Sequence, residues 1–425
     1  MKAADNSKMG EDFFKYLPSE IVVNIFSRLP TRAAMACKCV CKPWLGLLAT
    51  PEFVNSHMSR SVPAIAVETH TKSYDVIEFV DELGIDFDEE HFRDAPFSFD
   101  EVHRWGAPFN FDKEHRWEVT FSFSFPFGVP IRSSANGLIF LRDFDRGDNL
   151  ILCNPVTRDY ITLPCPQQTS PKVQNYMDNF GFGVSGMTGE YKVVRIFAET
   201  PQRREGFKNA CQVYTVGTGS WRKVPFGRPL RFCDDIGGVH LNGNLYWMVA
   251  KTTRGFCRWI CCFDLEAELF STFAAPPPRG RDFLYGRSLC VLRGCLCVSD
   301  ISHNGRDISD DESDDSNDEG DIPNDGHVII WCMKGDDHSW TKIFVIPEVE
   351  RLAGLGNIWP IIIFKNGDAL MEWDDGMIFF YSGKRKNFDC EIMSLEGRDP
   401  FTSTIMYAPS FVSLKSFAME NVSSF

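Results

Sequence analysis

The chain has 425 residues, of which 44% are hydrophobic, and a formal net charge of −14. This length exceeds one small core and allows two or three domains. The excess of acidic residues argues against nucleic-acid binding over the whole surface, because such binding needs a basic face.

The first residues, 1–15, are polar and contain no apolar stretch like that of a signal peptide. No run approaches the ~18 apolar residues that cross a membrane. We therefore expect a protein of the cytoplasm, the nucleus or both, with no membrane partner. Its fifteen cysteines are then expected to be reduced thiols and not a disulfide framework.

Residues 12–60 have helical spacing, and we expect residues 1–11 to be disordered. The apolar residues of the first predicted helix fall on one helical face, and Pro30 ends that helix. Further helices are expected over Thr31–Lys38 and Pro43–Ala49. Thr50 followed by Pro51 predicts the capped start of a fourth.

From residue 61 to residue 420 the pattern changes to short apolar runs that alternate with turns, which predicts a long all-β domain. The dipeptide Asn-Gly, a strong signal for a two-residue hairpin turn, occurs at 136–137, 242–243 and 366–367. A hairpin of this kind and a second strand–turn–strand unit recur together about every 50 residues, as in a propeller blade.

Five such units are readable, and residues 61–130 are expected to close the ring with the C-terminal strands as a sixth blade. The predicted fold is thus a multidomain α+β chain, with a small all-α module before a large all-β propeller-like domain of about six blades. A stacked double sandwich is the alternative, because periodicity alone does not count blades.

Two segments interrupt the regular pattern. The sequence "APFSFDEVHRW" at 95–105 recurs as "APFNFDKEHRW" at 107–117, which predicts either a duplicated surface loop or a recognition loop with exposed Trp and Arg. An acidic run lies within residues 305–326, and we expect it to be a disordered loop between strands. Our guess for target-binding residues is Arg104, Trp105, Arg116 and Trp117.

The helical module resembles the F-box. The matching features between Leu17 and Leu48 are the Leu-Pro start, the apolar first helix, the "RLP" break and the "CVCKPW" ending. The β region resembles the plant F-box-associated domain, which is related to kelch-type propellers. It shares with that domain, in order, "NGL", "NPVTR", "YKVVRI", "VYTVGTGSWR" and "SWTKIF".

The resemblance implies the substrate-recognition subunit of a Skp–cullin–F-box ubiquitin ligase. Its F-box would bind a Skp-family adaptor, and through it a cullin and a RING subunit, while the β domain would bind a target protein. The apolar side chains exceed what three short helices need for one inner face, so they either bind this adaptor or pack against the β domain. The residues expected to bind the adaptor are Leu17, Pro18, Ile21, Val22, Ile25, Leu29, Pro30, Val40, Cys41 and Trp44.

Such a subunit needs no catalytic residues of its own, and we expect no enzyme activity, no cofactor and no metal. Cys37, Cys39 and Cys41 alternate and lack the spacing of a zinc site. The glycines of "GFGVSG" at 181–186 precede no helix, which argues against phosphate binding. Two alternatives stay open: an F-box/propeller module in a non-degradative adaptor complex, and a propeller enzyme or lectin with a vestigial helical lead.

Overall fold

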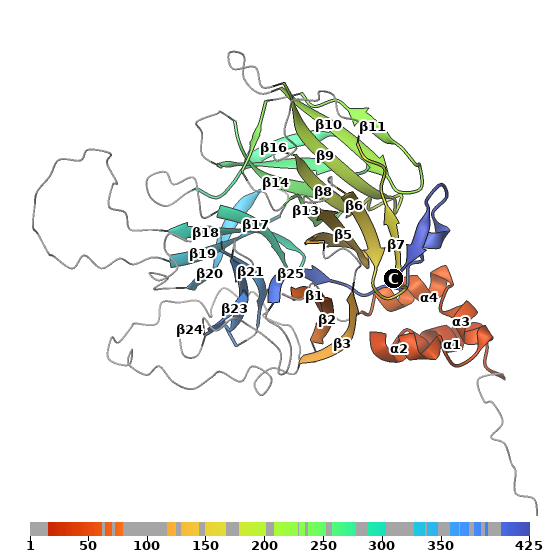
Figure 1. The fold of residues 1–425 in the computed structure, drawn as a ribbon. Coiled ribbons are helices and arrows are strands. Elements are labelled where there is room, and N and C mark those ends of the chain that lie inside the picture. The colour runs from red at the N-terminus through yellow and green to blue at the C-terminus, as the bar shows by residue number, and fades with distance from the viewer. Residues whose placement is uncertain are drawn as a thin grey trace, which may run out of the picture.

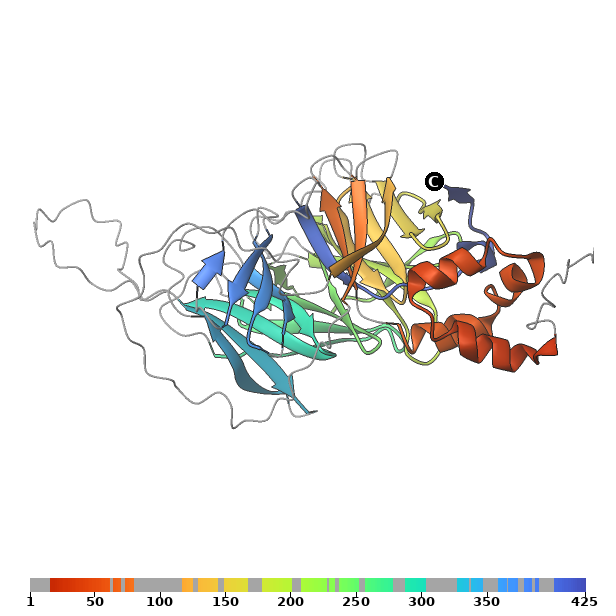
Figure 2. The ribbon, with the colours of Figure 1, turned by 90° about the horizontal axis from the view of Figure 1, so that it is seen from below.

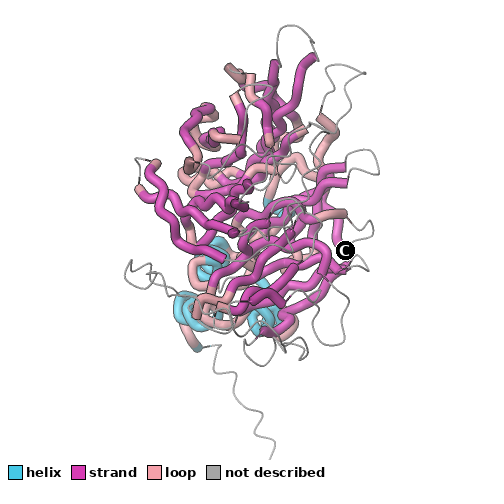
Figure 3. Tube along the Cα trace, turned by 90° about the vertical axis from the view of Figure 1, so that its left-hand side faces the viewer, coloured by secondary structure: helices cyan, strands magenta, loops and turns pink. Residues whose placement is uncertain are grey.

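The computed structural model describes residues 16–61, 64–69, 73–79, 117–124, 129–143, 149–166, 178–200, 208–227, 229–233, 237–251, 257–277, 287–302, 327–335, 338–346, 358–364, 366–373, 378–383, 387–389 and 401–425. Within these ranges, four short helices lie together beside a large β domain (Figures 1 and 3). The change from helical to period-two spacing near residue 60 is therefore a real structural boundary.

The helices are α1 (Ser19–Phe26), α2 (Thr31–Cys37), α3 (Lys42–Leu47) and α4 (Pro51–Met58). Pro18 and Pro30 immediately precede α1 and α2, where the missing N–H of a proline costs nothing. The Thr50 hydroxyl accepts the N–H of Phe53 at 3.3 Å, which confirms the predicted cap of α4.

The β domain consists of six antiparallel sheets, which we call blades 1 to 6. Blade 1 contains β4 (Ile131–Ala135), β5 (Leu138–Asp143), β6 (Asn149–Asn154), β7 (Asp159–Thr162) and β26 (Val422–Ser424). Blade 2 contains β8 (Asn179–Val184), β9 (Tyr191–Thr200), β10 (Lys208–Thr215) and β11 (Trp221–Val224). Blade 3 contains β12 (Arg231–Phe232), β13 (Val239–Leu241), β14 (Asn244–Ala250), β15 (Trp259–Asp264) and β16 (Phe270–Ala274).

Blade 4 contains β17 (Arg287–Leu292), β18 (Cys295–Ser302), β19 (His327–Lys334) and β20 (Ser339–Ile346). Blade 5 contains β21 (Ile358–Ile363), β22 (Ala369–Trp373), β23 (Ile378–Ser382) and β24 (Asn387–Asp389). Blade 6 contains β25 (Phe401–Tyr407), β1 (Ala64–Thr69), β2 (Ser73–Phe79) and β3 (Trp117–Ser124).

The ring is closed by the two ends of the β region. β25 pairs with β1 in antiparallel register, with Ala64 opposite Tyr407, so residues from both ends share blade 6. This confirms the predicted sixth blade and excludes the stacked sandwich. The fifth strand of blade 1 was not predicted: β26 pairs with β7, and the β domain therefore extends past residue 420.

The apolar cores lie between neighbouring blades. Six clusters of buried side chains join blade 1 to blade 2, 2 to 3, 3 to 4, 4 to 5, 5 to 6 and 6 to 1. Each sheet is therefore covered by apolar contacts on both faces. This explains why strands such as β5 are buried along their whole length and do not alternate.

The predicted Asn-Gly turns are confirmed at two positions. Asn136 and Gly137 have φ of 42° and 85°, and Asn242 and Gly243 have φ of 49° and 76°. This left-handed pair is the geometry of a two-residue hairpin turn. At Asn366–Gly367 only the glycine has a positive φ, because the flanking strands stop earlier and the N–H of Phe364 bonds to the carbonyl of Asp368.

The glycines of "GFGVSG" serve packing. A Cβ on Gly181 would lie 2.7 Å from the ring of Trp247 in blade 3. A Cβ on Gly183 would lie 2.5 Å from the ring of His240 in the same blade. These two positions in β8 require glycine, because side chains of blade 3 occupy the space that a methyl group would need.

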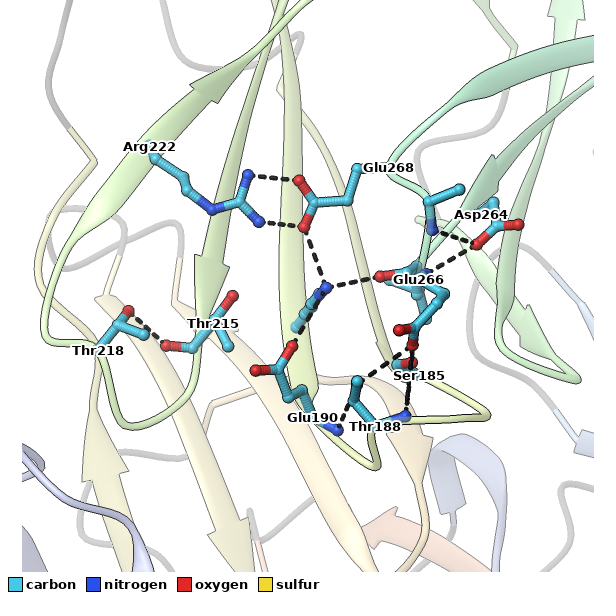
Figure 4. A network of polar contacts seen from close by, with 12 residues as sticks. Ser185, Thr188, Glu190, Thr215, Thr218, Arg222, Asp264, Glu266 and Glu268 are labelled. Atoms are coloured by element: carbon cyan, nitrogen blue, oxygen red, sulfur yellow. Dashed lines mark hydrogen bonds and ion pairs between the residues drawn. The ribbon is translucent and has the colours of Figure 1, made fainter.

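Polar contacts also tie blade 2 to blade 3 (Figure 4). Lys192 of β9 donates from Nζ to the carbonyl of Leu265 at 2.6 Å and to Oε1 of Glu268 at 3.0 Å. Glu268 also receives both guanidinium nitrogens of Arg222. The buried ammonium of Lys192 thus has two acceptors from the next blade, and Oε2 of Glu190, which precedes β9, lies 3.4 Å from it, so the charge is well compensated.

Two tryptophans of the repeated "SW" sequence connect successive blades. Trp221 at the start of β11 donates to the carbonyl of Pro164, which follows blade 1's β7, at 2.7 Å. Trp340 of β20 donates to the carbonyl of Ala274, at the end of blade 3's β16, at 3.1 Å. The motif recurs in the sequence because each indole satisfies a carbonyl of the preceding blade.

The expectation of reduced cysteines is wrong at one pair, because Cys233 and Cys257 form a disulfide. Cys233 follows β12 and Cys257 precedes β15, and both strands flank β14, so the two Cα atoms lie 6.2 Å apart. The sequence separates these cysteines by 24 residues and contains no local signal of the pairing. The other twelve cysteines of the described ranges are free thiols.

Candidate functional site

Helix α1 carries two apolar stripes side by side. Val22 and Phe26, four residues apart, are buried toward the other helices. Ile21 and Ile25 are rotated by one residue and keep 48% and 40% of their surface exposed. Because residues four apart share a helix face, α1 has one covered apolar face and one open apolar face.

The covered face belongs to a core that the helices share with the propeller. Phe26, Leu48 and Phe53 are buried in one cluster with Val156 of blade 1 and Phe411 of the C-terminal segment. Trp44 packs edge-on against Phe26, with ring centroids 4.6 Å apart, and remains half-buried. The alternative that apolar side chains of the helices pack against the β domain is therefore correct for this face.

The open face extends beyond α1. Val40, between α2 and α3, is 61% exposed, and Leu45 of α3 is 50% exposed. Of the nine large hydrophobic side chains that are exposed within the described ranges, five lie between Tyr16 and Leu45. Exposed apolar side chains gathered on a module that already has a buried core are the usual mark of a docking surface.

The predicted adaptor-binding residues divide into three groups. The exposed ones are Pro18, Ile21, Ile25, Pro30 and Val40, the half-buried ones are Leu17, Leu29, Cys41 and Trp44, and Val22 is buried. Val22 is a correction, because a side chain in the module's own core is not available to a partner. Leu45 was missed, although its place one residue after Trp44 points it away from the side that Trp44 and Leu48 share.

Charged groups near the core have pKa values set mainly by burial. Burial lowers the pKa of the Lys38 ammonium, against an opposing effect of the Asp159 carboxylate. Its Nζ lies 4.5 Å from the ring centroid of Phe411. Burial also lowers the pKa of His57, against an opposing hydrogen bond with the backbone of Leu29. The core therefore favours a neutral imidazole between the helices and the propeller.

The cysteines of the module give no indication of a metal site. Within the described residues no group of three or more His, Cys, Asp or Glu side chains is arranged to hold a metal ion. Burial raises the pKa of the Cys37 thiol, which disfavours the thiolate that a metal or an oxidant would need. No helix in the same ranges is long and apolar enough to span a membrane.

The guessed target-binding residues are mostly outside the described ranges. Arg104, Trp105 and Arg116 are not described, and neither is the acidic run within 305–326. Trp117 is the first residue of β3, where its backbone pairs with Phe79. One residue earlier in β2, Glu78 pairs with Ala64, the first residue of β1, so β2 ends and β3 begins at the end of blade 6 where the helices join it.

Comparisons with known proteins agree with this organisation. The F-box-like family matches residues 14–56, and the F-box associated beta propeller domain matches residues 101–307. F-box protein At3g07870 of Arabidopsis thaliana is 25% identical over 412 residues, which cover 88% of this chain and 86% of the relative. Putative F-box protein At1g53370 of the same plant is 23% identical over 395 residues, which cover 90% and 88%.

Among solved structures, an oligogalacturonate lyase in complex with manganese is similar over 62% of this chain and 65% of its own. The TM-score is 0.32 and the identity 9%, values too low to support any argument about activity. The family matches and the plant relatives therefore describe the chain best. An F-box-like domain lies at its N-terminus, an F-box associated β-propeller domain follows it, and the whole arrangement is similar to that of Arabidopsis F-box proteins.

Proposed function

We propose that this chain is the substrate-recognition subunit of a Skp–cullin–F-box ubiquitin ligase. The observation that carries the proposal is the open apolar face of the F-box helices, formed by Ile21, Ile25, Val40 and Leu45. In this role the face binds a Skp-family adaptor, and Trp44 and Leu17 supply the half-buried rim. The adaptor joins the chain to a cullin and a RING subunit.

The propeller is then the part that binds the target protein. Its six interlocked blades form a rigid support, on which connecting loops can vary without loss of the core. The chain contributes no catalytic group in this proposal. It raises the effective concentration of the target beside the ubiquitin-charged enzyme, and proximity of this kind is sufficient to accelerate transfer.

The first test replaces the open face of α1. In the double variant Ile21→Asp with Ile25→Asp, two charges occupy positions that the adaptor would have to desolvate. At about 2 kcal/mol for each of the two lost contacts, binding to a purified Skp-family adaptor should weaken roughly 1,000-fold. Both side chains already reach solvent, so the melting temperature should stay near that of the unmodified chain.

The matched control is Leu269→Asp, which makes the same change at an exposed apolar residue in a propeller turn far from α1 in the sequence. It should bind the adaptor with unchanged affinity. Equal binding by all three chains in isothermal titration would refute the assigned surface. Reconstituted ubiquitin transfer to captured targets then separates two roles. A ligase receptor binds the adaptor and supports ubiquitin transfer to the target, whereas a non-degradative complex binds the adaptor equally well but supports no transfer.

A further inference from the structure

The C-terminal residues 408–425, which we call the C-terminal strap, run beside the F-box helices. After β25 ends at Tyr407, the strap passes α4 and returns to pair β26 with β7 (Figures 1 and 2). It contains one short 3-10 helix, η5 (Leu414–Ser416), whose Leu414 is fully buried. A segment with this path contacts both domains of the chain.

Blade 1 holds the first part of the strap. The side-chain amide of Asn154 donates to the carbonyl of Ser410 at 2.9 Å and to the carbonyl of Val412 at 2.7 Å. Its Oδ1 accepts the N–H of Val156 at 2.9 Å, so this fully buried amide uses both donors and its oxygen. A Cβ on Gly137 would lie 2.1 Å from Cβ of Ser410, so the strap also needs this glycine.

Blade 2 and the edge of blade 1 hold the second part. Phe417 packs edge-on against Tyr191, with ring centroids 5.7 Å apart. One carboxylate oxygen of Glu420 accepts the hydroxyl of Tyr214 and the N–H of Gly217, each at 2.7 Å. The strap is therefore fixed to the propeller on both sides of Phe411, without help from the helices.

Phe411, between these two attachments, belongs to the core of the F-box helices. Its ring centroid lies 5.2 Å from that of Phe53 and 5.0 Å from that of His57, both on α4. Nearby, the hydroxyl of Ser61 donates to the carbonyl of Pro409 at 3.3 Å. The propeller thus places a side chain of the far C-terminus inside the N-terminal domain.

We propose that the C-terminal strap is a positioning element that fixes the F-box on the propeller, with Asn154 and Phe411 as its positioning residues. The four helices have six to eight residues each and complete their core with Phe411 and Val156, against which Phe121 of β3 and Val412 of the strap also pack. The F-box and the propeller accordingly move as one body. In the proposed ligase, which this extension assumes, the strap sets the direction in which a bound target faces the adaptor.

The test is hydrogen exchange mass spectrometry on the full chain. In Asn154→Ala the strap loses its anchor, although Asn154 donates to no atom of the helices. Amides of α1 and α4 should then exchange at least about tenfold faster, whereas those of β14 and β15 should be unchanged. Phe411→Ala should give the same pattern, and Phe411→Leu should restore most of the protection. Glu420→Ala is a milder variant to use if Asn154→Ala does not fold.

Asn209→Ala is the matched control. Asn209 is a buried asparagine of blade 2 that donates to a carbonyl, that of Leu230 at 2.6 Å, but lies outside the strap. It should leave exchange in α1 and α4 unchanged. Protection of both helices at the level of the unmodified chain in Asn154→Ala and Phe411→Ala would overturn the proposal.

Adaptor binding separates this proposal from the proposed function. The strap variants keep the open face of α1, so they should bind the adaptor within about threefold of the unmodified chain while ubiquitin transfer falls more steeply. If the unmodified chain binds no adaptor, the proposed function fails and the exchange experiment still decides the role of the strap. If transfer survives together with fast exchange of α1 and α4, the strap positions the F-box without controlling transfer.

Discussion

The F-box helices and the propeller differ in how completely they bury their apolar side chains. Every blade is covered on both faces by its neighbours, and side chains such as Trp247, Val249 and Phe263 of blade 3 are removed from solvent. The helices are covered by the propeller and the strap on one side only, and the other side keeps Ile21 and Ile25 in solvent. The blades thus bury their apolar faces against one another, whereas the helices keep one apolar face open to solvent.

The strongest test of this contrast uses neighbouring residues of α1. Phe26→Ala removes a fully buried ring and should destabilise the F-box by about 3–5 kcal/mol, while Ile25→Ala should cost less than about 1 kcal/mol. The measurement is the urea midpoint of α1 from hydrogen exchange. Similar midpoints for the two variants would show that the two stripes are not different environments.

The contact between blades 2 and 3 should respond to one methyl group. Gly181→Ala places a Cβ 2.7 Å from the ring of Trp247 and should lower the unfolding free energy of the propeller by about 1–3 kcal/mol. Gly186→Ala, in the turn that follows β8, is the control, because nothing lies within 4 Å of its Cβ. Urea denaturation followed by tryptophan fluorescence compares the two, and equal midpoints would contradict close packing at Gly181.

The smallest expected effect is a dependence on pH in the joint between helices and propeller. Burial lowers the pKa of His57, so the unfolded chain takes up the proton first and stability falls as the pH drops below the unfolded value of ~6.5. One such group changes stability by at most about 1.4 kcal/mol per pH unit. The ammonium of Lys38, which also contacts Phe411, is positively charged and therefore does not stabilise a protonated His57.

His57→Phe keeps the ring contacts with Phe53 and Phe411 and removes the titration. Between pH 7.5 and pH 5.5, the protection factors of the α4 amides, which correct for the intrinsic pH dependence of exchange, should fall more in the unmodified chain than in this variant. An identical fall in both chains would assign the pH dependence to another group, such as the half-buried His240 of blade 3, whose pKa burial also lowers.

Local patterns in the sequence predicted most of the elements. Thr50 with Pro51 located α4, and Asn136–Gly137 with Asn242–Gly243 located two hairpins, because caps and tight turns depend on a few adjacent residues. The spacing of the repeats predicted the blades. These signals contain no information on what lies beside an element in space.

The features that escaped prediction depend on residues far apart in the chain. The covered face of α1 is defined by Val156 and Phe411, and neither can be identified from the helical pattern around Val22. The pairing of β26 with β7 and the Cys233–Cys257 disulfide are contacts of the same kind. The sequence predicted that the helices together carry more apolar side chains than one inner face needs, but only the fold shows which of them stay exposed.

The pairing of β25 with β1 has a consequence for how the protein is made. Synthesis proceeds from the N-terminus, so β1 leaves the ribosome long before its partner strand exists. The ring stays open, with β1 exposed as an unpaired edge, until the last two dozen residues emerge. A stop codon between the F-box helices and residue 401 would therefore release a chain whose ring cannot close, because the strand that pairs with β1 is missing.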